Sequence, residues 1–195
     1  MRGIWNLLAV IGLVTVVAIG YFAPTGFSAV SRFLEFDPKA YETYKTMVKN
    51  ILETGNAAEA TVWRAKVADG VTFEDLDESI RFIANENNIQ NVGELPLYKQ
   101  VEAMRGTPYR TVKIYMFCNA LTAVSMLEHS DAYSAYLPCR LSVVEDKQGD
   151  LWIYTLNMDP MIYGGLPLPA ALKTEAEGVK TIILDIMERG ASGDF

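Results

Sequence analysis

The most hydrophobic part of the chain lies at its amino terminus. No charged residue occurs between Arg2 and Arg32, and residues 4–23 are almost entirely apolar. About 20 such residues are needed to cross the ~30 Å hydrocarbon core of a bilayer. We therefore predict a single transmembrane anchor within residues 1–31, which contacts lipid through residues 4–23. A cleaved signal peptide is the alternative, although its apolar region usually has only about 7–15 residues.

Charges on the two sides of this segment say little about its orientation. Arg2 and the amino terminus precede it, and Arg32 and Lys39 follow it. Basic residues favour the cytoplasmic side, so these two pairs oppose each other. A short charged start before a long apolar run is typical of an export signal. We expect the domain to face outward, on the periplasmic side if the protein is bacterial.

Residues 32–57 have the pattern of a linker and an amphipathic helix. Asp37 is placed as an N-cap, and Pro38 suits the first helical position. Gly55 marks the stop. Apolar residues between them recur at helical spacing, at Tyr44, Met47, Val48, Ile51 and Leu52.

Residues 58–195 are predicted to form one domain of mixed strands and helices. Alternating patterns predict strands at 60–67, 111–118, 139–145 and 151–156, the last two as a hairpin. Helical spacing and capping residues predict helices from Thr72 to the polar run at 85–91, and at 97–104, 120–129 and 170–189, the last ending at Gly190. The order lacks regular βαβ alternation. An α+β fold is therefore expected, as a two-layer sandwich of helices on an antiparallel or mixed sheet.

The predicted strand 111–118 has two different faces. One carries Val112, Ile114, Met116 and Cys118, and the other carries Lys113, Tyr115 and Phe117. In one interpretation the first face is buried and Cys118 is part of the core; in the other, Cys118 is a reactive thiol. Helix 120–129 is expected to turn Ala120, Ala123, Val124 and Leu127 inward.

The overall charge restricts the possible partners. The chain of 195 residues has a formal net charge of −7. An acidic domain repels the phosphate backbone, so nucleic acid is not an expected partner. The sequence has no phosphate-binding glycine motif, and its only histidine is His129. A catalytic triad would therefore have only one possible base.

Several short motifs occur together in the second half of the chain. Cys118-Asn119 closes a strand, Leu137-Pro138-Cys139 opens another, an acidic hairpin follows, and Asp159-Pro160 comes after it. In these motifs, over residues 58–190, the chain resembles the family called domain of unknown function 302. It departs from the family at Ala120, where many members have proline. The resemblance implies a small α+β fold, often dimeric, and no established activity.

Cys118 and its neighbours are the sharpest candidates for a ligand or redox site. If Asn119 caps the next helix, the Cys118 sulfur lies beside free backbone N–H groups, which favour the thiolate. Met116 and Cys139 are the other candidates in this set. Met104, Met126, Met158 and Met161 add thioether sulfurs that suit Cu(I), although core packing is the default explanation for them.

The relation between Cys118 and Cys139 has two possible outcomes. Outside the cytoplasm the two cysteines could form a disulfide. If the helix between them is a parallel crossover, they lie at opposite ends of adjacent strands and cannot be bridged. A buried face would instead make Cys118 a small hydrophobic core residue.

An aromatic-rich region is the candidate interface. It comprises Tyr133, Tyr136, Trp152, Tyr154 and Tyr163. Such residues often anchor protein interfaces. The leading hypothesis is a membrane-anchored, non-catalytic binding or accessory subunit that contacts a membrane protein complex, or a second copy of itself. The alternatives are a sulfur-centred redox, soft-metal or haem site at Cys118, and an enzyme with Cys118 as nucleophile. The sequence names no cofactor.

Overall fold

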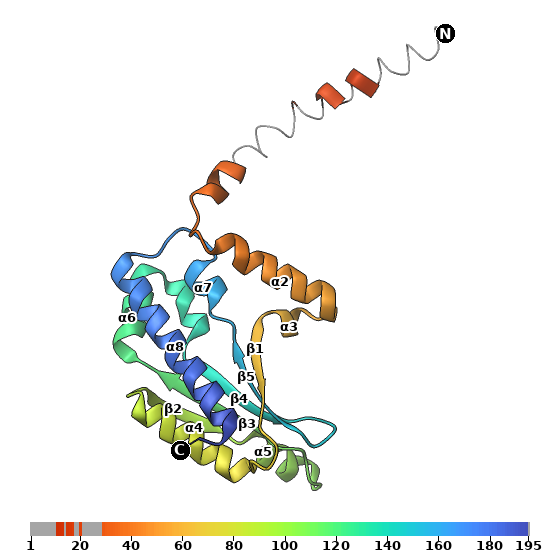
Figure 1. Cartoon of the computed structure of the whole chain (residues 1–195), viewed down its shortest axis with the longest axis vertical. Coiled ribbons are helices and arrows are strands. Elements are labelled where there is room, and N and C mark those ends of the chain that lie inside the picture. Colours follow the sequence, from red (N-terminus) through yellow and green to blue (C-terminus); the bar gives the residue numbers. More distant parts are fainter. Residues whose placement is uncertain (1–10, 14, 18–19, 21–28, 195) are drawn as a thin grey trace.

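The computed structural model describes residues 11–13, 15–17, 20 and 29–194. Among these residues, no helix combines the length and the apolar character needed to cross a membrane. Apart from 11–13, 15–17 and 20, the predicted anchor at 4–23 lies outside the described residues. Residues 29–34 are helical and lead into the folded domain (Figure 1).

The strands of residues 29–194 form one antiparallel sheet in the order β1-β5-β4-β3-β2. They are β1 (Val62–Lys66), β2 (Gln90–Leu95), β3 (Val112–Cys118), β4 (Cys139–Glu145) and β5 (Leu151–Leu156). The prediction left antiparallel and mixed sheets open, and the antiparallel one is correct. The hairpin of β4 and β5 has the predicted bounds.

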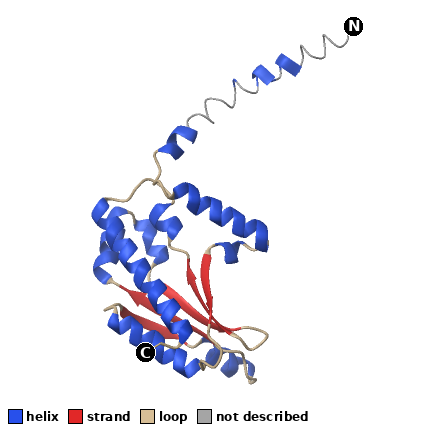
Figure 2. Cartoon of the chain, in the orientation of Figure 1, coloured by secondary structure: helices blue, strands red, loops and turns tan. Residues whose placement is uncertain are grey.

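Helices from both halves of the chain surround this sheet. They are α2 (Ala40–Thr54), α3 (Ala57–Ala60), α4 (Phe73–Glu86), α5 (Leu97–Arg105), α6 (Ala120–His129), the 3-10 helix η1 (Asp131–Tyr136), α7 (Asp159–Tyr163) and α8 (Ala170–Ser192). Helices α4 and α8 pack against each other and lie across one face of the sheet (Figure 2). The α+β fold class is therefore confirmed.

Side-chain caps fix the starts of helices α4 and α6, whereas α2 begins without one. Thr72 and Asp75 form a reciprocal capping box at α4, in which the Thr72 hydroxyl accepts from the Asp75 N–H at 3.1 Å. Asn119 caps α6 by accepting from the Thr122 N–H at 3.3 Å, as predicted. At α2 the N-cap is Lys39 instead of Asp37, and the Asp37 carboxylate accepts from the Lys39 N–H at 2.9 Å.

The two faces of the sheet decide between the interpretations of strand 111–118. On the face under α4 and α8, Tyr115 and Phe117 are 0% exposed. Val112, Ile114, Met116 and Cys118 are partly exposed on the opposite face, so the interpretation in which this face is buried is wrong. Lys113 is buried because its ammonium group reaches Asp77 on α4 and Glu94 on β2, the latter at 2.8 Å. These partners offset the cost of burying a charge.

Three further expectations about elements were wrong. Strand β2 was missed because its residues are polar and its pairing with β3 is interrupted by a bulge. Helix α8 continues through Gly190 and ends at Gly193. Gly190 is buried in the contact with α4, where a Cβ atom would lie 3.2 Å from Ile80 Cγ1. On α6, Val124 is exposed and Met126 is the buried residue.

Candidate functional site

A narrow cleft lies at the end of the sheet where β3 ends and β4 begins. Its lining comes from strands β3, β4 and β5, from helices α6, η1, α7 and α8, and from the segments between them. Met126 and Met158 are buried in it, while the lining residues Asn119, Tyr136 and Arg140 are exposed. The cavity has a volume of about 50 Å³. One water molecule takes up about 30 Å³ in the liquid, so the cleft has room for an ion or one or two waters.

Both cysteines line this cleft. Strands β3 and β4 are antiparallel neighbours, and Cys139 is paired with Phe117, the residue before Cys118. The parallel crossover considered for the two cysteines is therefore wrong, because they lie at the same end of the sheet. Both are free thiols. Burial, and then the proximity of Cys118, raise the pKa of the Cys139 thiol to about 11.

Part of the predicted aromatic region also lies at the cleft. Tyr133 and Tyr136 line it, with their ring centroids 6.4 Å apart. The Tyr133 hydroxyl donates to the Met161 carbonyl at 3.4 Å. Burial, and to a lesser degree Tyr136, raise the pKa of Tyr133. The cleft therefore combines Cys118, Asn119 and Cys139 with two of the predicted aromatic residues.

The remaining ligand candidate and two interface candidates lie on the open face of the sheet, the face opposite α4 and α8. Met116 lies over Gly93, where a Cβ atom would be 2.8 Å from the Met116 methyl carbon. Trp152 and Tyr154 are partly exposed on the same face, with their rings 6.5 Å apart. The Trp152 indole N–H donates to Asp146 at 2.9 Å. These three residues are thus separated from the cleft lining.

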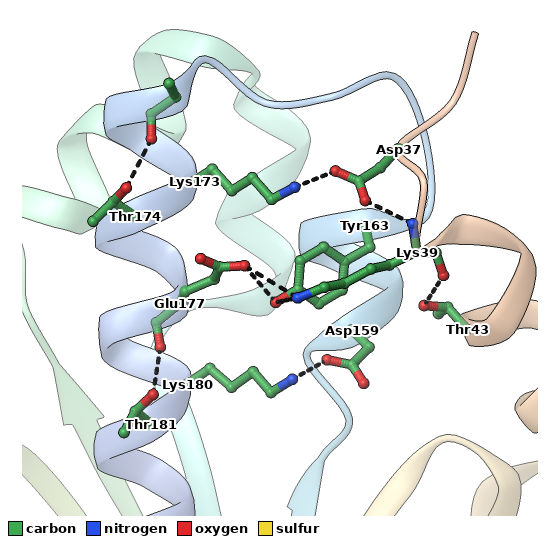
Figure 3. A network of polar contacts seen from close by, with 11 residues as sticks. Asp37, Lys39, Thr43, Asp159, Tyr163, Lys173, Thr174, Glu177, Lys180 and Thr181 are labelled. Carbon is green, nitrogen blue, oxygen red and sulfur yellow. Dashed lines mark hydrogen bonds and ion pairs between the residues drawn. The ribbon is translucent and has the colours of Figure 1, made fainter.

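Tyr163 lies neither in the cleft nor on the open face. It lies at a polar junction between α2, α7 and α8 (Figure 3). Its hydroxyl donates to Glu177 at 2.7 Å, and burial followed by this hydrogen bond raises the pKa of Tyr163. The ammonium groups of Lys39, Lys173 and Lys180 lie 4.4, 5.2 and 5.3 Å from its ring centre. The predicted aromatic region is therefore divided among three sites.

A charged network around buried Lys113, with Arg81 at its exposed side, was missed by the sequence analysis. Lys113 forms ion pairs with Asp77 and Glu94, and Arg81 holds Glu94 by two hydrogen bonds of 2.8 and 2.7 Å. The Tyr115 hydroxyl donates to Asp77. The only signal in the sequence was a lysine alternating with Tyr115 and Phe117 in a strand. Every charge in the network has an opposite partner, which is sufficient for a structural role.

Metal ligands of the usual kinds are not grouped in the described residues. Over residues 11–13, 15–17, 20 and 29–194, no three His, Cys, Asp or Glu side chains lie close enough together to hold a metal ion. Methionine sulfur is the second kind of sulfur in the cleft lining.

Together the fold and the cleft define a class, a small α+β domain with an antiparallel sheet open on one face and sulfur-containing residues at one end. The chain belongs to the family described as domain of unknown function DUF302, whose model matches residues 64–190. The crystal structure of an uncharacterized conserved DUF302 protein from Bacillus stearothermophilus is similar, with a TM-score of 0.52 and 18% identity. The similarity covers 66% of this chain and 97% of that one and shows a shared fold. No curated protein matches the chain.

Proposed function

We propose that this protein is a membrane-anchored, non-catalytic binding domain that contacts a protein of a membrane complex and is able to self-associate. The observation that carries the proposal is the open face of the sheet. Trp152 and Tyr154 lie there only partly covered, although both are large aromatic residues. Aromatic side chains with one polar group are enriched in protein interfaces.

The charges on the open face support a protein partner. The charged strand residues on this face are Arg64, Lys66 and Arg140, and no described strand position there is acidic. Arg64 lies over the Trp152 ring, 5.4 Å from its centre. Arg64 and Lys66 are also paired with carboxylates, Glu59 at 3.8 Å and Asp150 at 2.9 Å, so these two charges are partly neutralised. An acidic surface on a partner would complement this face.

Residues 4–23 are proposed to hold the domain at the membrane, with the domain on the outer side. The proposal rests on their apolar sequence and on the way the following segment joins the domain. The Asp37 N–H donates to the Gly165 carbonyl at 2.8 Å, and the Asp37 carboxylate is ion-paired with Lys173 of α8. The Tyr44 hydroxyl donates to the Gly164 carbonyl. Residues 37–44 therefore form part of the domain.

Buried Asp37 is the centre of this attachment (Figure 3). Burial alone would raise its pKa, but the hydrogen bond from Lys173 and the Lys39 N–H lower the pKa overall. The carboxylate is thus kept charged at neutral pH.

The anchor is tested by charged substitutions in the full-length protein. Leu13→Lys combined with Val17→Lys places two charges in the apolar segment, each costing about 2.5–3.5 kcal/mol at the centre of a membrane helix. We expect the wild type to float with lipid vesicles and the double variant to lose most of this association. Val30→Lys, outside the segment, is the control. Wild-type protein that stays in the soluble fraction would contradict the anchor.

The open face is tested in mild detergent. Native mass spectrometry of the full-length protein should give a stoichiometric complex, either a homodimer or a complex with one partner protein. Trp152→Glu and Tyr154→Glu should dissociate it, because they place acidic charge in an apolar contact. Met104→Glu, an exposed position on α5, should leave it intact. A lone monomer in the wild type, or equal loss in all three variants, would count against the proposal.

The cleft favours a second function, a sulfur-centred ligand or redox site. The specific observation is that Cys118 and Cys139 lie at the same end of neighbouring strands and line one cavity. Titration with a thiol-reactive disulfide should modify partly exposed Cys118 in the native protein. Cys139 should react more slowly than it does in the unfolded chain, because burial raises the pKa of its thiol. Native protein in which Cys118 does not react would end this proposal.

A further inference from the structure

Helix α7 belongs both to the cleft and to the polar junction described above. It has only five residues, and Met161 on it contributes to the lining of the cleft. Tyr163, two residues further along, lies in the junction with α2 and α8 (Figure 3). The Tyr133 hydroxyl donates to the Met161 carbonyl at 3.4 Å and so links α7 to the wall of the cleft. A displacement of α7 would therefore change the cleft.

The connection that follows α7 is able to bend. It begins with Gly164 and Gly165 and continues through residues 166–169 to α8. Glycine has the widest backbone freedom of any residue. Both glycine carbonyls accept a hydrogen bond from the segment at the start of α2. The Tyr44 hydroxyl donates to Gly164, and the Asp37 N–H donates to Gly165 at 2.8 Å. The start of α2 thus holds the most flexible part of this connection.

The approach of α2 to this connection is close. Gly164 is buried, and a Cβ atom at this position would lie 2.9 Å from the Tyr44 hydroxyl oxygen. The same atom would lie 2.3 Å from the Pro160 carbonyl oxygen of α7. Real Cβ atoms essentially never come closer than 3.0 Å to such neighbours. Glycine is therefore needed at position 164 for α2 and α7 to pack as they do.

Helix α2 is held on the domain with little apolar burial. Among its fifteen described residues, Ala40 alone is buried. Val48 and Leu52 are 52% and 80% exposed, although both are apolar. The hydrophobic contribution is proportional to the apolar area removed from water, so it is small for this helix. Segments with few buried apolar contacts are those that open locally while the rest of a protein stays folded.

Polar contacts at the start of α2 therefore supply most of its attachment. The Asp37 carboxylate is ion-paired with Lys173 of α8. The Lys39 ammonium group lies 3.6 Å from the Glu177 carboxylate and donates to the Tyr163 hydroxyl at 3.4 Å. These contacts join α2 to α7 and α8 at one place. Losing a few of them is sufficient to release the start of the helix.

We propose that residues 37–44 are a latch that holds α7 in place, and that release of this latch opens the cleft. The inference rests on the cleft proposed above as a sulfur-centred site, and it adds the control of access to that site. In the latched state α7 keeps Met161 in the wall, and the cavity measures about 50 Å³. After Tyr44 and Asp37 leave the two glycine carbonyls, the connection bends, and the cleft admits molecules larger than water.

The labelling rate of the Cys139 thiol reports this opening, because Cys139 lines the cleft and is largely covered. The purified full-length protein in detergent is treated with iodoacetamide. Mass spectrometry of its peptides then gives separate labelling rates for Cys139 and Cys118. Hydrogen exchange of the same samples compares α2 and α7 with α4, which lies outside the latch and the cleft lining.

Two variants weaken the latch in different ways. Asp37→Asn removes the charge that pairs with Lys173, and Tyr44→Phe removes the hydrogen bond to Gly164. We expect Cys139 to be labelled at least about 10-fold faster in the first and about 3–10-fold faster in the second, the scale of a charged and a neutral hydrogen bond. Exchange should become faster in α2 and α7 and stay unchanged in α4.

Glu42→Gln is the matched control. It breaks the ion pair with Lys45 on the same helix, where both side chains are exposed and the distance is 3.2 Å. The labelling rate of Cys139 should equal that of the wild type, because this pair makes no contact with α7. A rate as high as that of Asp37→Asn would contradict the latch.

Two further results would overturn the inference. One is a wild-type rate of Cys139 labelling in folded Asp37→Asn and Tyr44→Phe. The other is faster exchange in α4 as well as in α7, because this would show general loosening of the domain. The sulfur-centred proposal is judged separately, on whether Cys118 reacts in the wild type. The latch is judged on the Cys139 rate and on the exchange of α7.

Discussion

The covered and open faces of the sheet differ in a way that hydrophobicity alone does not predict. On strand β3, the charged residue lies on the covered face, and the opposite face carries only uncharged residues. Under α4 and α8, strand β3 places Lys113 beside Tyr115 and Phe117. On the open face the same strand places only uncharged residues, including Ile114 and Met116. Lysine is buried because helix α4 and strand β2 supply carboxylates to it. The apolar residues on the other face stay partly exposed, because α4 and α8 pack on the covered face. A charge on one face of a strand is therefore a poor guide to which face is buried.

The largest expected effect compares two neighbouring residues on the two faces. Phe117→Ala should destabilise the protein by about 3–5 kcal/mol, the usual cost of removing a buried aromatic ring. Met116→Ala, at a partly exposed position, should cost about 1 kcal/mol, a typical value for substitutions outside the core. Urea unfolding of the full-length variants in detergent measures the difference. Similar losses in the two variants would show that the open face is covered after all.

The next comparison concerns two lysines of the sheet. Lys113→Met removes the buried one of the two cations, Lys113 and Arg81, that pair with Asp77 and Glu94. We expect a loss of about 3 kcal/mol, as for breaking a buried ion pair. Lys66→Met lies on the open face, where its partner Asp150 is also accessible to solvent. Its stability in the same urea experiment should be nearly unchanged. If Lys66→Met were the more damaging variant, the contrast between the two faces would be wrong.

The third comparison concerns the pH dependence of stability. The hydrogen bonds from Arg81, opposed by burial, lower the pKa of Glu94 to about 2 from an ordinary value of 4.5. Between these two pH values the unfolded chain binds the proton and the folded protein does not, so stability falls as the pH falls. Wild-type protein should lose this contribution between about pH 4.5 and pH 2, as linkage requires. Glu94→Gln should have a flatter profile there, measured by urea midpoints at each pH. An unchanged profile would contradict the ionised Glu94 of the network.

Local signals in the sequence predicted those elements that depend on neighbouring residues. Helix 120–129 and the hairpin of 139–145 and 151–156 were predicted with their observed bounds. The first depends on the Asn119 cap, and the second depends on alternation around a turn. Strand β2 was missed because its polar sequence has no strand pattern of its own, and it is held in the sheet by pairing with β3.

The sequence predicted which residues belong to the candidate site, but it did not predict how they lie relative to one another in space. Cys118, Asn119 and Cys139 were named, and they do line one cleft. Their proximity follows from the antiparallel pairing of β3 and β4, which the sequence left open. The separation of Tyr163 from Tyr133 has a similar cause. It depends on Glu177 and three lysines from distant parts of the chain.

The strand order has a consequence for the synthesis of the protein. Strand β1 is the first to leave the ribosome, but its only neighbour in the sheet is β5, the last strand to be made. Until residue 156 has emerged, β1 is a solitary edge with unsatisfied backbone groups. The amino-terminal segment is made earlier still. A factor that shields residues 62–66 during translation would therefore increase the yield of folded protein.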